Sequence, residues 1–163
     1  MTKGPTPTKA DDFPSLDAID HQIISTLSTD GRITFAELGR QTNLSSPAVA
    51  ERVKRLEQAG VITGYRAEID PRALGYQLTA IVRVKPAVRQ LSKIAELAQE
   101  IPEISECHRI TGEDCFLVKV HAASVPDLEE LLDQFLTYGQ TVSSIVVSTP
   151  VPPRPLPLPG EDG

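Results

Sequence analysis

A pair of helical segments separated by a very short break constrains the fold of this chain more than any other sequence feature. Thr34 and Glu37 have the Thr-x-x-Glu spacing of a capping box, in which each side chain accepts a hydrogen bond from a backbone amide at the helix start. A helix that begins there extends to about Thr42, and the small Gly39 within it lets another helix approach closely. Asn43 begins a tight break, so the second helix must follow almost at once.

The second helix of this pair has both of its ends marked in the sequence. Ser46 supplies an N-cap, Pro47 suits the first helical position, and Gly60 suits the position just after the last turn. An apolar repeat at helical spacing from Leu16 predicts one further helix ahead of the pair. Residues 16–60 are therefore expected to form a three-helix, helix-turn-helix domain.

After this domain the apolar pattern alternates between the period of strands and the period of helices. The expected strands are 77–85, 104–111, 114–122 and 141–148, and the expected helices are 89–100 and 125–138. This β-α-β-β-α-β order is the ferredoxin-like plan, in which both helices cover one face of a four-stranded antiparallel sheet. The predicted fold class is therefore α+β, with a helix-turn-helix domain followed by a ferredoxin-like domain.

The two ends of the chain are rich in Pro and lack periodicity, which is typical of tails. The predicted division is a tail 1–15, the helix-turn-helix domain 16–60, a linker strand 61–75, the ferredoxin-like domain 76–150 and a Pro-rich tail 151–163. The second tail is either a polyproline II segment that docks on a neighbour or a simple extension.

The charge and the cysteine content restrict the partners and the compartment. The formal net charge is −6, so a contact with nucleic acid must come from a local basic patch rather than from the whole surface. Cys107 and Cys115 form no C-x-x-C pair, no secretory leader opens the chain, and no apolar run approaches the roughly 20 residues that span a bilayer. We expect a soluble cytoplasmic protein without disulfides and without a membrane partner.

The face of the sheet that the helices leave uncovered predicts a subunit contact. In strand 77–85 the residues Thr79, Ile81 and Arg83 lie on that face, and Ile81 is apolar, so the face is not purely polar. The chain has four Phe, three Tyr and no Trp, so the cores of its two domains are small and mainly aliphatic. Two small domains leave apolar surface for subunits to cover. Dimerisation of sheet against sheet is the expected solution.

The third helix contains the residues that predict binding to DNA. Val49, Val53 and Leu56 face inward at helical spacing, so short side chains at the helix start and basic side chains further along face outward. Recognition helices place such N-terminal residues against base edges, while Arg and Lys contact phosphates. The expected DNA-binding residues are Ser45, Ser46, Pro47, Ala48, Glu51, Arg52, Lys54 and Arg55. The alternative is that the basic residues only solvate an exposed helix face and pair with Glu51 or Glu57.

Three segments, LDAIDHQIISTLSTDGR, LSSPAVAERVKRLEQAGVITGY and ECHRITGEDCFLVKV, together resemble the Lrp/AsnC family of transcription regulators. The resemblance covers residues 16 to about 150. It implies a winged helix-turn-helix, a linker strand through residues 62–69 and a ferredoxin-like domain. It also implies that the partners are double-stranded DNA, an amino-acid effector bound between dimers, and further copies of the chain in tetramers, octamers or hexadecamers.

The resemblance further implies where the effector binds, at the turn between the second and third sheet strands and at hydroxyl groups of the last strand. The corresponding residues are Thr111, Gly112, Glu113, Asp114, Thr141 and Ser143. Amides of a Gly-containing turn can bind a carboxylate, and an acidic side chain can bind an ammonium group. The alternative is a plain hairpin turn with edge-strand hydroxyls. Cys115 stands where members of the family commonly have a second Asp at the turn.

Histidines and cysteines of the second domain raise two other possible functions, catalysis and metal binding. The haem-precursor decarboxylases share this two-domain build and use histidines, and this chain has His21, His108 and His121, but strand histidines are more often structural. Cys107, His108, Cys115 and His121 do not form a closely spaced metal-ligand pattern. We therefore expect no enzymatic activity, no cofactor and no metal. An architectural protein that wraps DNA without any effector remains the alternative to a regulator.

Overall fold

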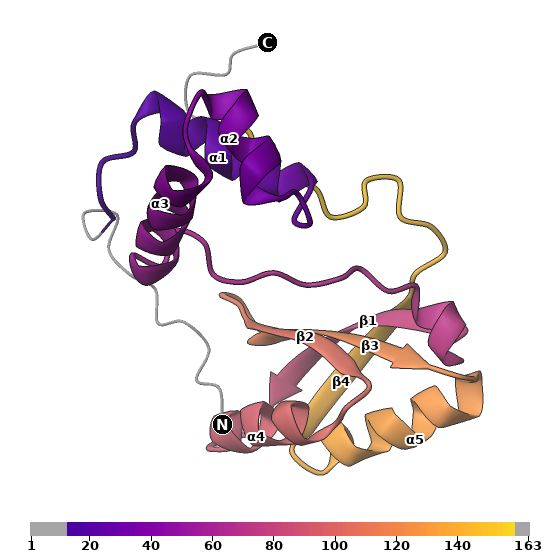
Figure 1. Ribbon diagram of the computed structural model, residues 1–163. Helices are drawn as coiled ribbons and strands as arrows, with labels where there is room; N and C mark the ends of the chain where they lie inside the picture. Colours follow the sequence, from indigo (N-terminus) through magenta and orange to yellow (C-terminus); the bar gives the residue numbers. More distant parts are fainter. Residues whose placement is uncertain (1–12, 159–163) are drawn as a thin grey trace. The chain divides into compact units, whose positions relative to one another are not determined.

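A computed structural model of the chain describes residues 13–158, which fall into two compact units (Figure 1). The first unit extends to Ala67 and includes the residues from Pro153 onward, and the second is Glu68–Pro152. The start of the Pro-rich segment thus groups with the first unit, whereas most of the predicted N-terminal tail and residues 159–163 lie outside the described residues. No helix in residues 13–158 is long and apolar enough to cross a membrane.

The first unit consists of three helices around a small aliphatic core, as the sequence predicted. They are α1 (Ala18–Thr29), α2 (Phe35–Thr42) and α3 (Ser46–Gln58). The buried apolar core residues are Ile23, Leu38, Val49, Val53 and Leu56. The spacing of Val49, Val53 and Leu56 gives α3 one apolar stripe, which packs with Ile23 of α1 and Leu38 of α2.

The turn between α2 and α3 is tight because Asn43 adopts a left-handed conformation and Gly39 has no side chain. Asn43 has a φ of 56°, and the amide of Leu44 donates to the carbonyl of Gly39 over 2.9 Å. A Cβ atom on Gly39 would lie 2.5 Å from the Leu44 carbonyl oxygen, which belongs to backbone that cannot move without opening the turn. Gly39 therefore permits the close approach that the sequence predicted for it.

The helix ends differ in detail from the predictions. Thr34 accepts a hydrogen bond from the Glu37 amide over 3.2 Å, but the Glu37 carboxylate pairs with Arg40 instead of closing the predicted capping box. A complete capping box occurs at the start of α1, between Asp17 and Asp20. The Glu37 carboxylate turns away because a cation one helical turn along is a stronger partner than an amide.

The N-cap of α3 is Ser45, one residue earlier than predicted, and its hydroxyl accepts from the Ala48 amide over 3.4 Å. The helix ends as the sequence indicated, since Gly60 has a φ of 71°. Its amide donates to the Glu57 carbonyl, and the Val61 amide donates to the Leu56 carbonyl, which is the Schellman pattern.

The second unit has the predicted ferredoxin-like topology. Its elements are the 3₁₀ helix η2 (Pro71–Leu74), the strands β1 (Leu78–Pro86), β2 (Ile104–Arg109), β3 (Phe116–Ala122) and β4 (Gly139–Ile145), and the helices α4 (Leu91–Glu100) and α5 (Val125–Leu136). The sheet order is β2-β3-β1-β4, and all three strand pairs are antiparallel.

Both helices cover the same face of the sheet (Figure 1), and the core lies between them and the sheet. On the sheet side that core contains Ala80, Val82, Val84, Phe116, Val118, Val120 and Ala122. The other face, here called the open face, presents the intervening side chains of the strands. Ile81, Leu117 and Val142 give it apolar positions beside the charged Arg83 and Lys119.

The strands around the turn 110–115 are shorter than predicted. Cys115 has a φ of 55° and Gly112 a φ of 112°, conformations that no strand contains, so β2 ends at Arg109 and β3 begins at Phe116. Residues 62–69, expected as a linker strand, are paired with no other strand among residues 13–158. A strand needs a neighbour for its backbone hydrogen bonds, and the described chain offers none there.

Candidate nucleic-acid interface and effector turn

The first turns of α3 present small and polar side chains to solvent. Ser45, Ser46 and Pro47 are exposed, and Ala48 is half-buried beside the core residue Val49. Glu51 and Lys54 follow on the exposed side one and two turns later. Because no bulky residue stands at this end of the helix, another surface can approach its backbone closely.

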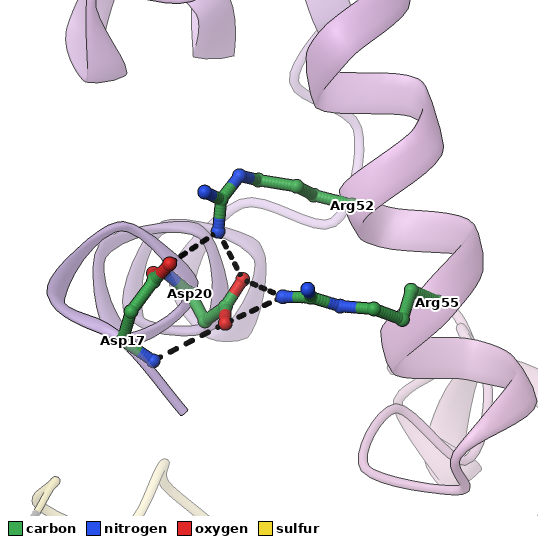
Figure 2. Close-up of polar contacts among 4 residues, drawn as sticks. All are labelled: Asp17, Asp20, Arg52 and Arg55. Atoms are coloured by element: carbon green, nitrogen blue, oxygen red, sulfur yellow. Dashed lines mark hydrogen bonds and ion pairs between the residues drawn. The ribbon is translucent and has the colours of Figure 1, made fainter. Parts of the chain in front are cut away.

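Arg52 and Arg55 have a different environment, which was not among the expectations from the sequence. Arg52 Nη1 lies 2.7 Å from Asp17 Oδ2 and 2.8 Å from Asp20 Oδ1 (Figure 2). Arg55 Nη2 lies 2.8 Å and 2.7 Å from the two carboxylate oxygens of Asp20. These four residues, here called the Asp-Arg cluster, connect the start of α1 to the flank of α3. The arginines therefore pair with α1 and not with the glutamates of their own helix.

The members of the Asp-Arg cluster differ in their exposure to solvent. The Asp20 side chain is 1% exposed, whereas those of Asp17 and Arg55 are 52% and 53% exposed and that of Arg52 is 26% exposed. A buried carboxylate is stable only with hydrogen-bonding and cationic partners, and the two arginines supply both. Asp20 is thus the fixed centre of the cluster.

Hydrogen bonding keeps the exposed members of the cluster charged. The pKa of Asp17 is below its ordinary value. The main cause is the hydrogen bond that its carboxylate accepts from the Asp20 amide, and the second is the hydrogen bond from the Arg52 guanidinium. The pKa of Arg52 is raised, mainly by its hydrogen bond to the Asp17 carboxylate and secondly by its hydrogen bond to the Asp20 carboxylate. Both groups are therefore ionised at neutral pH.

One signal in the sequence points to this cluster. Asp20 lies one turn before the core residue Ile23 on the apolar stripe of α1, so its carboxylate is directed into the domain. A lone carboxylate on a buried stripe requires a cation, and Arg52 and Arg55, three residues apart on one helix flank, are suitable partners.

The charges of residues 13–67, the larger part of the first unit, balance. Residues 13–67 contain six Asp or Glu and six Arg or Lys residues, and the Asp-Arg cluster accounts for two of each. Arg40 is also paired, with Glu37. Lys54 forms no ion pair with any described residue and lies on the exposed side of α3. The basic character expected for this face is consequently local and weak.

The acidic residues of the turn 110–115 point toward cations of β1. Glu113 Oε2 lies 3.2 Å from Lys85 Nζ, and Asp114 Oδ2 lies 3.2 Å from Arg83 Nη1. Arg83 and Lys85 alternate with buried core residues, so both ion pairs are on the open face of the sheet. The turn is closed by the Ile110 amide, which donates to the Cys115 carbonyl over 2.8 Å.

The predicted hydroxyl residues of β4 lie at the same end of the sheet but on its other face. Thr141 is opposite Val84 and Ser143 is opposite Val82, both of which face the helices. Val84 is also opposite Phe116, which follows the turn by one residue. A single copy of the chain therefore does not gather the six predicted effector residues into one pocket.

Two cavities of the second unit include none of these six residues. One of about 390 Å³ lies between α4 and β2 and includes Cys107 and Arg109. Another of about 340 Å³ lies beside α5 and includes Tyr76, Glu103 and His121. None of the predicted effector residues lines either cavity.

The strand histidines have structural partners. His121 lies 3.0 Å from the Thr79 hydroxyl and 2.9 Å from the Ser105 hydroxyl, one at each ring nitrogen. His108 Nε2 lies 3.3 Å from a carboxylate oxygen of Glu106. Within residues 13–158 no three His, Cys, Asp or Glu side chains are placed to hold a metal ion.

Comparison with known families and proteins gives a consistent result over both units. A sequence model of the AsnC-type helix-turn-helix domain matches residues 16–57, and one of the Lrp/AsnC ligand binding domain matches residues 79–156. The chain is 36% identical over 133 residues to the transcriptional regulator LrpC of Bacillus subtilis, covering 82% of this chain and 92% of LrpC.

Regulators of Mycobacterium tuberculosis are also similar to this chain, in sequence and in solved structure. The transcriptional regulator LrpA is 37% identical over 138 residues, which cover 83% of this chain and 92% of LrpA. A feast or famine regulatory protein, solved in complex with L-methionine, superposes with a TM-score of 0.82 at 36% identity. That superposition covers 87% of this chain and 99% of the solved one.

Proposed function

The chain belongs to the Lrp/AsnC family of transcription regulators, and on that premise we propose that it reads DNA with the first turns of α3 and adjusts this binding to an amino-acid effector. Its relatives are named transcriptional regulators, and the chain is a DNA-binding regulator rather than an enzyme of the decarboxylase kind. We place its action on double-stranded DNA in the cytoplasm.

The observation that supports the DNA contact best is the exposed, small-residue end of α3. Ser45, Ser46 and Pro47 leave the helix backbone accessible, and the tight turn at Gly39 fixes this end relative to α2. Lys54 and the exposed part of Arg55 lie further along the helix, where cations of a recognition helix meet phosphates. The proposed contact residues are Ser45, Ser46, Pro47, Ala48, Glu51, Arg52, Lys54 and Arg55.

A pair of serine substitutions tests this contact. Ser46→Glu places a carboxylate at the first residue of α3, where the helix tolerates it but DNA phosphates repel it. We expect a loss of more than about tenfold in affinity for a duplex selected in vitro with the full chain. Ser92→Glu, in the first turn of α4, makes the same change in the other unit and serves as the control. Equal affinities of the two variants would contradict the proposed contact.

For the effector we propose an amino acid bound at Thr111, Gly112, Glu113 and Asp114 together with Thr141 and Ser143. The family membership and the relative solved with L-methionine support this class of ligand. Gly112 has a left-handed conformation in this turn. Amides of such a turn can bind a carboxylate, and Glu113 and Asp114 offer oxygens to an ammonium group. The hydroxyls lie on the other sheet face, which favours a site completed by another copy of the chain.

Calorimetry of the full chain with each of the twenty amino acids tests the effector. Heat with one of them, lost in Asp114→Asn, supports the proposal. No heat with any amino acid favours the alternative, a protein that organises DNA without an effector.

We also propose a homodimer that forms through the open face of the sheet. Ile81, Leu117 and Val142 are apolar side chains on a face that no helix of the unit covers. Leu117→Arg is expected to shift the sedimentation of the full chain toward the monomer, whereas Leu136→Arg, on an exposed position of α5, is not. Tetramers or octamers of such dimers complete the proposed assembly.

A further inference from the structure

The two aspartates of the Asp-Arg cluster are bound to the same arginines but are held very differently. Asp20 is 1% exposed and bonds to both guanidinium groups, whereas Asp17 is 52% exposed and bonds only to Arg52. The ion pair of Asp17 is therefore in contact with water, and such pairs contribute little to stability. Asp17 can leave Arg52 at small cost, and Asp20 cannot leave either arginine.

We propose that Arg52 and Arg55 form a binding site for a DNA phosphate, that Asp17 covers this site in the free protein, and that Asp20 holds both guanidinium groups in place when Asp17 is displaced. This inference rests on the proposed contact of α3 with DNA. It makes Asp17 a competitor of the phosphate and Asp20 a positioning residue.

The geometry of the arginines suits a phosphate oxygen. Arg52 donates to both carboxylates from Nη1 alone, and Arg55 donates to Asp20 from Nη2 alone. A guanidinium has five N–H donors, so most donors of each side chain remain available for a further acceptor. Arg55 is 53% exposed, and its free donors are accessible from the flank of α3.

The start of α1 adds a second attraction for an anion. Asp17 is the N-cap of this helix, and its carboxylate accepts from the Asp20 amide over 2.8 Å. The positive end of the helix dipole therefore lies beside the two arginines. Figure 2 shows the carboxylates of α1 directed at the arginines of α3, so a phosphate that replaces Asp17 meets both sources of positive charge.

A substitution that keeps the helix cap isolates the effect of the Asp17 charge. Asn caps helices as well as Asp does, so Asp17→Asn removes the competing charge and leaves α1 capped. We expect affinity for a selected duplex to rise about two- to fivefold at low salt and to converge with the wild type at high salt. The matched control is Asp30→Asn, which removes one charge from the same unit at a residue with no hydrogen bond or ion pair to the described residues of α3 and keeps an acceptor for the Arg32 amide.

A test of the positioning role of Asp20 must measure a quantity that partial unfolding of the variant alone does not change. In Asp20→Asn the arginines lose their fixed partner, so we expect the ratio of affinities for the selected duplex and for a mixed-sequence duplex to fall. Unfolding lowers both affinities together and leaves this ratio unchanged. Asp20→Glu restores the charge and is expected to recover part of the ratio.

The gain in affinity must depend on Arg52. In an Arg52→Ala background, Asp17→Asn is expected to give no further gain, and a gain of the same size there would refute the phosphate site. A rise in Asp30→Asn equal to that in Asp17→Asn, or no rise in Asp17→Asn, refutes it as well. Failure of the wild-type chain to bind either duplex instead overturns the proposed function.

Discussion

Both candidate sites of this protein are built from carboxylates paired with cations, but the pairs differ in their contact with water. In the Asp-Arg cluster one carboxylate, that of Asp20, is 1% exposed and joins two helices. At the turn 110–115 the Glu113 carboxylate is 86% exposed, and its partner Lys85 is also open to solvent. A buried pair fixes a geometry because breaking it leaves a charge without solvation, whereas an exposed pair is easily replaced by water or by a ligand.

This difference suits the two proposed roles. A helix that reads DNA must keep its orientation relative to the rest of its domain, and the Asp-Arg cluster supplies a fixed link between α1 and α3. A turn that binds a small zwitterion must instead exchange its own ion pairs for contacts with the ligand. The exposed pair of Glu113 meets that requirement, and the pair of Asp114, whose side chain is 29% exposed, meets it less fully.

The largest expected effect on stability is that of an Asp→Asn substitution in the Asp-Arg cluster, compared with the same substitution at the turn 110–115. Asp20→Asn removes the fixed centre of the Asp-Arg cluster and is expected to lower the free energy of unfolding by about 2–3 kcal/mol, less than for a fully buried pair because the arginines keep contact with water. Asp114→Asn is expected to change it by about 0.5 kcal/mol or less. Urea denaturation of both variants measures the two losses, and equal losses would remove the distinction between the sites.

Glycines of the two regions allow a second comparison. Gly39→Ala places a Cβ atom 2.5 Å from the Leu44 carbonyl oxygen, so the turn between α2 and α3 must open, at a cost of about 2 kcal/mol. Gly112→Ala meets nothing within 4 Å, and only its φ of 112° is unfavourable, at a cost of about 1 kcal/mol. Thermal unfolding of the two variants checks the order, and a larger loss at Gly112 would show that its turn is packed against something further.

Local sequence patterns were sufficient for most of the fold. The apolar repeats of α1, α4 and α5 and the alternation in β1 predicted the elements, because burial of one face imposes these periods. The element ends were less predictable. The position of β3 depends on the left-handed conformation of Cys115, which no pattern in the sequence indicates.

The candidate sites were predicted only where they depend on neighbouring residues in the sequence. Small residues at the start of α3 are visible in the sequence, and the structure leaves Ser45, Ser46 and Pro47 exposed. The pairing of Arg52 and Arg55 with α1 joins residues 32 and 35 positions apart, so it depends on how the helices are packed. The pattern within α3 alone predicted that these arginines face outward. The position of Asp20 on the apolar stripe of α1 could have predicted that Asp20 has cationic partners.

The two regions also respond differently to pH. Burial lowers the pKa of His121 below its ordinary value of 6.5, so the unfolded chain binds a proton more readily and stability is lost as the pH falls through this range. The pKa of Asp17 is lowered from 3.8, so its contribution is lost only at much lower pH. Between pH 7 and pH 5 we expect His121 to contribute a small loss of thermal stability. His121→Gln should flatten it, and an unchanged slope would assign the loss to another group.

The smallest expected effect is that of Glu113→Gln on stability. The Glu113 side chain is 86% exposed and that of Lys85 is 50% exposed, so their ion pair is screened and its removal should change the free energy of unfolding by less than about 0.5 kcal/mol. The same substitution should weaken an amino-acid response several-fold, because the neutral amide binds an ammonium group less strongly than the carboxylate does. Denaturation and calorimetry on one preparation measure both quantities. A large loss of stability would mean that Glu113 is buried in a contact between copies of the chain, and the turn would then resemble the Asp-Arg cluster rather than differ from it.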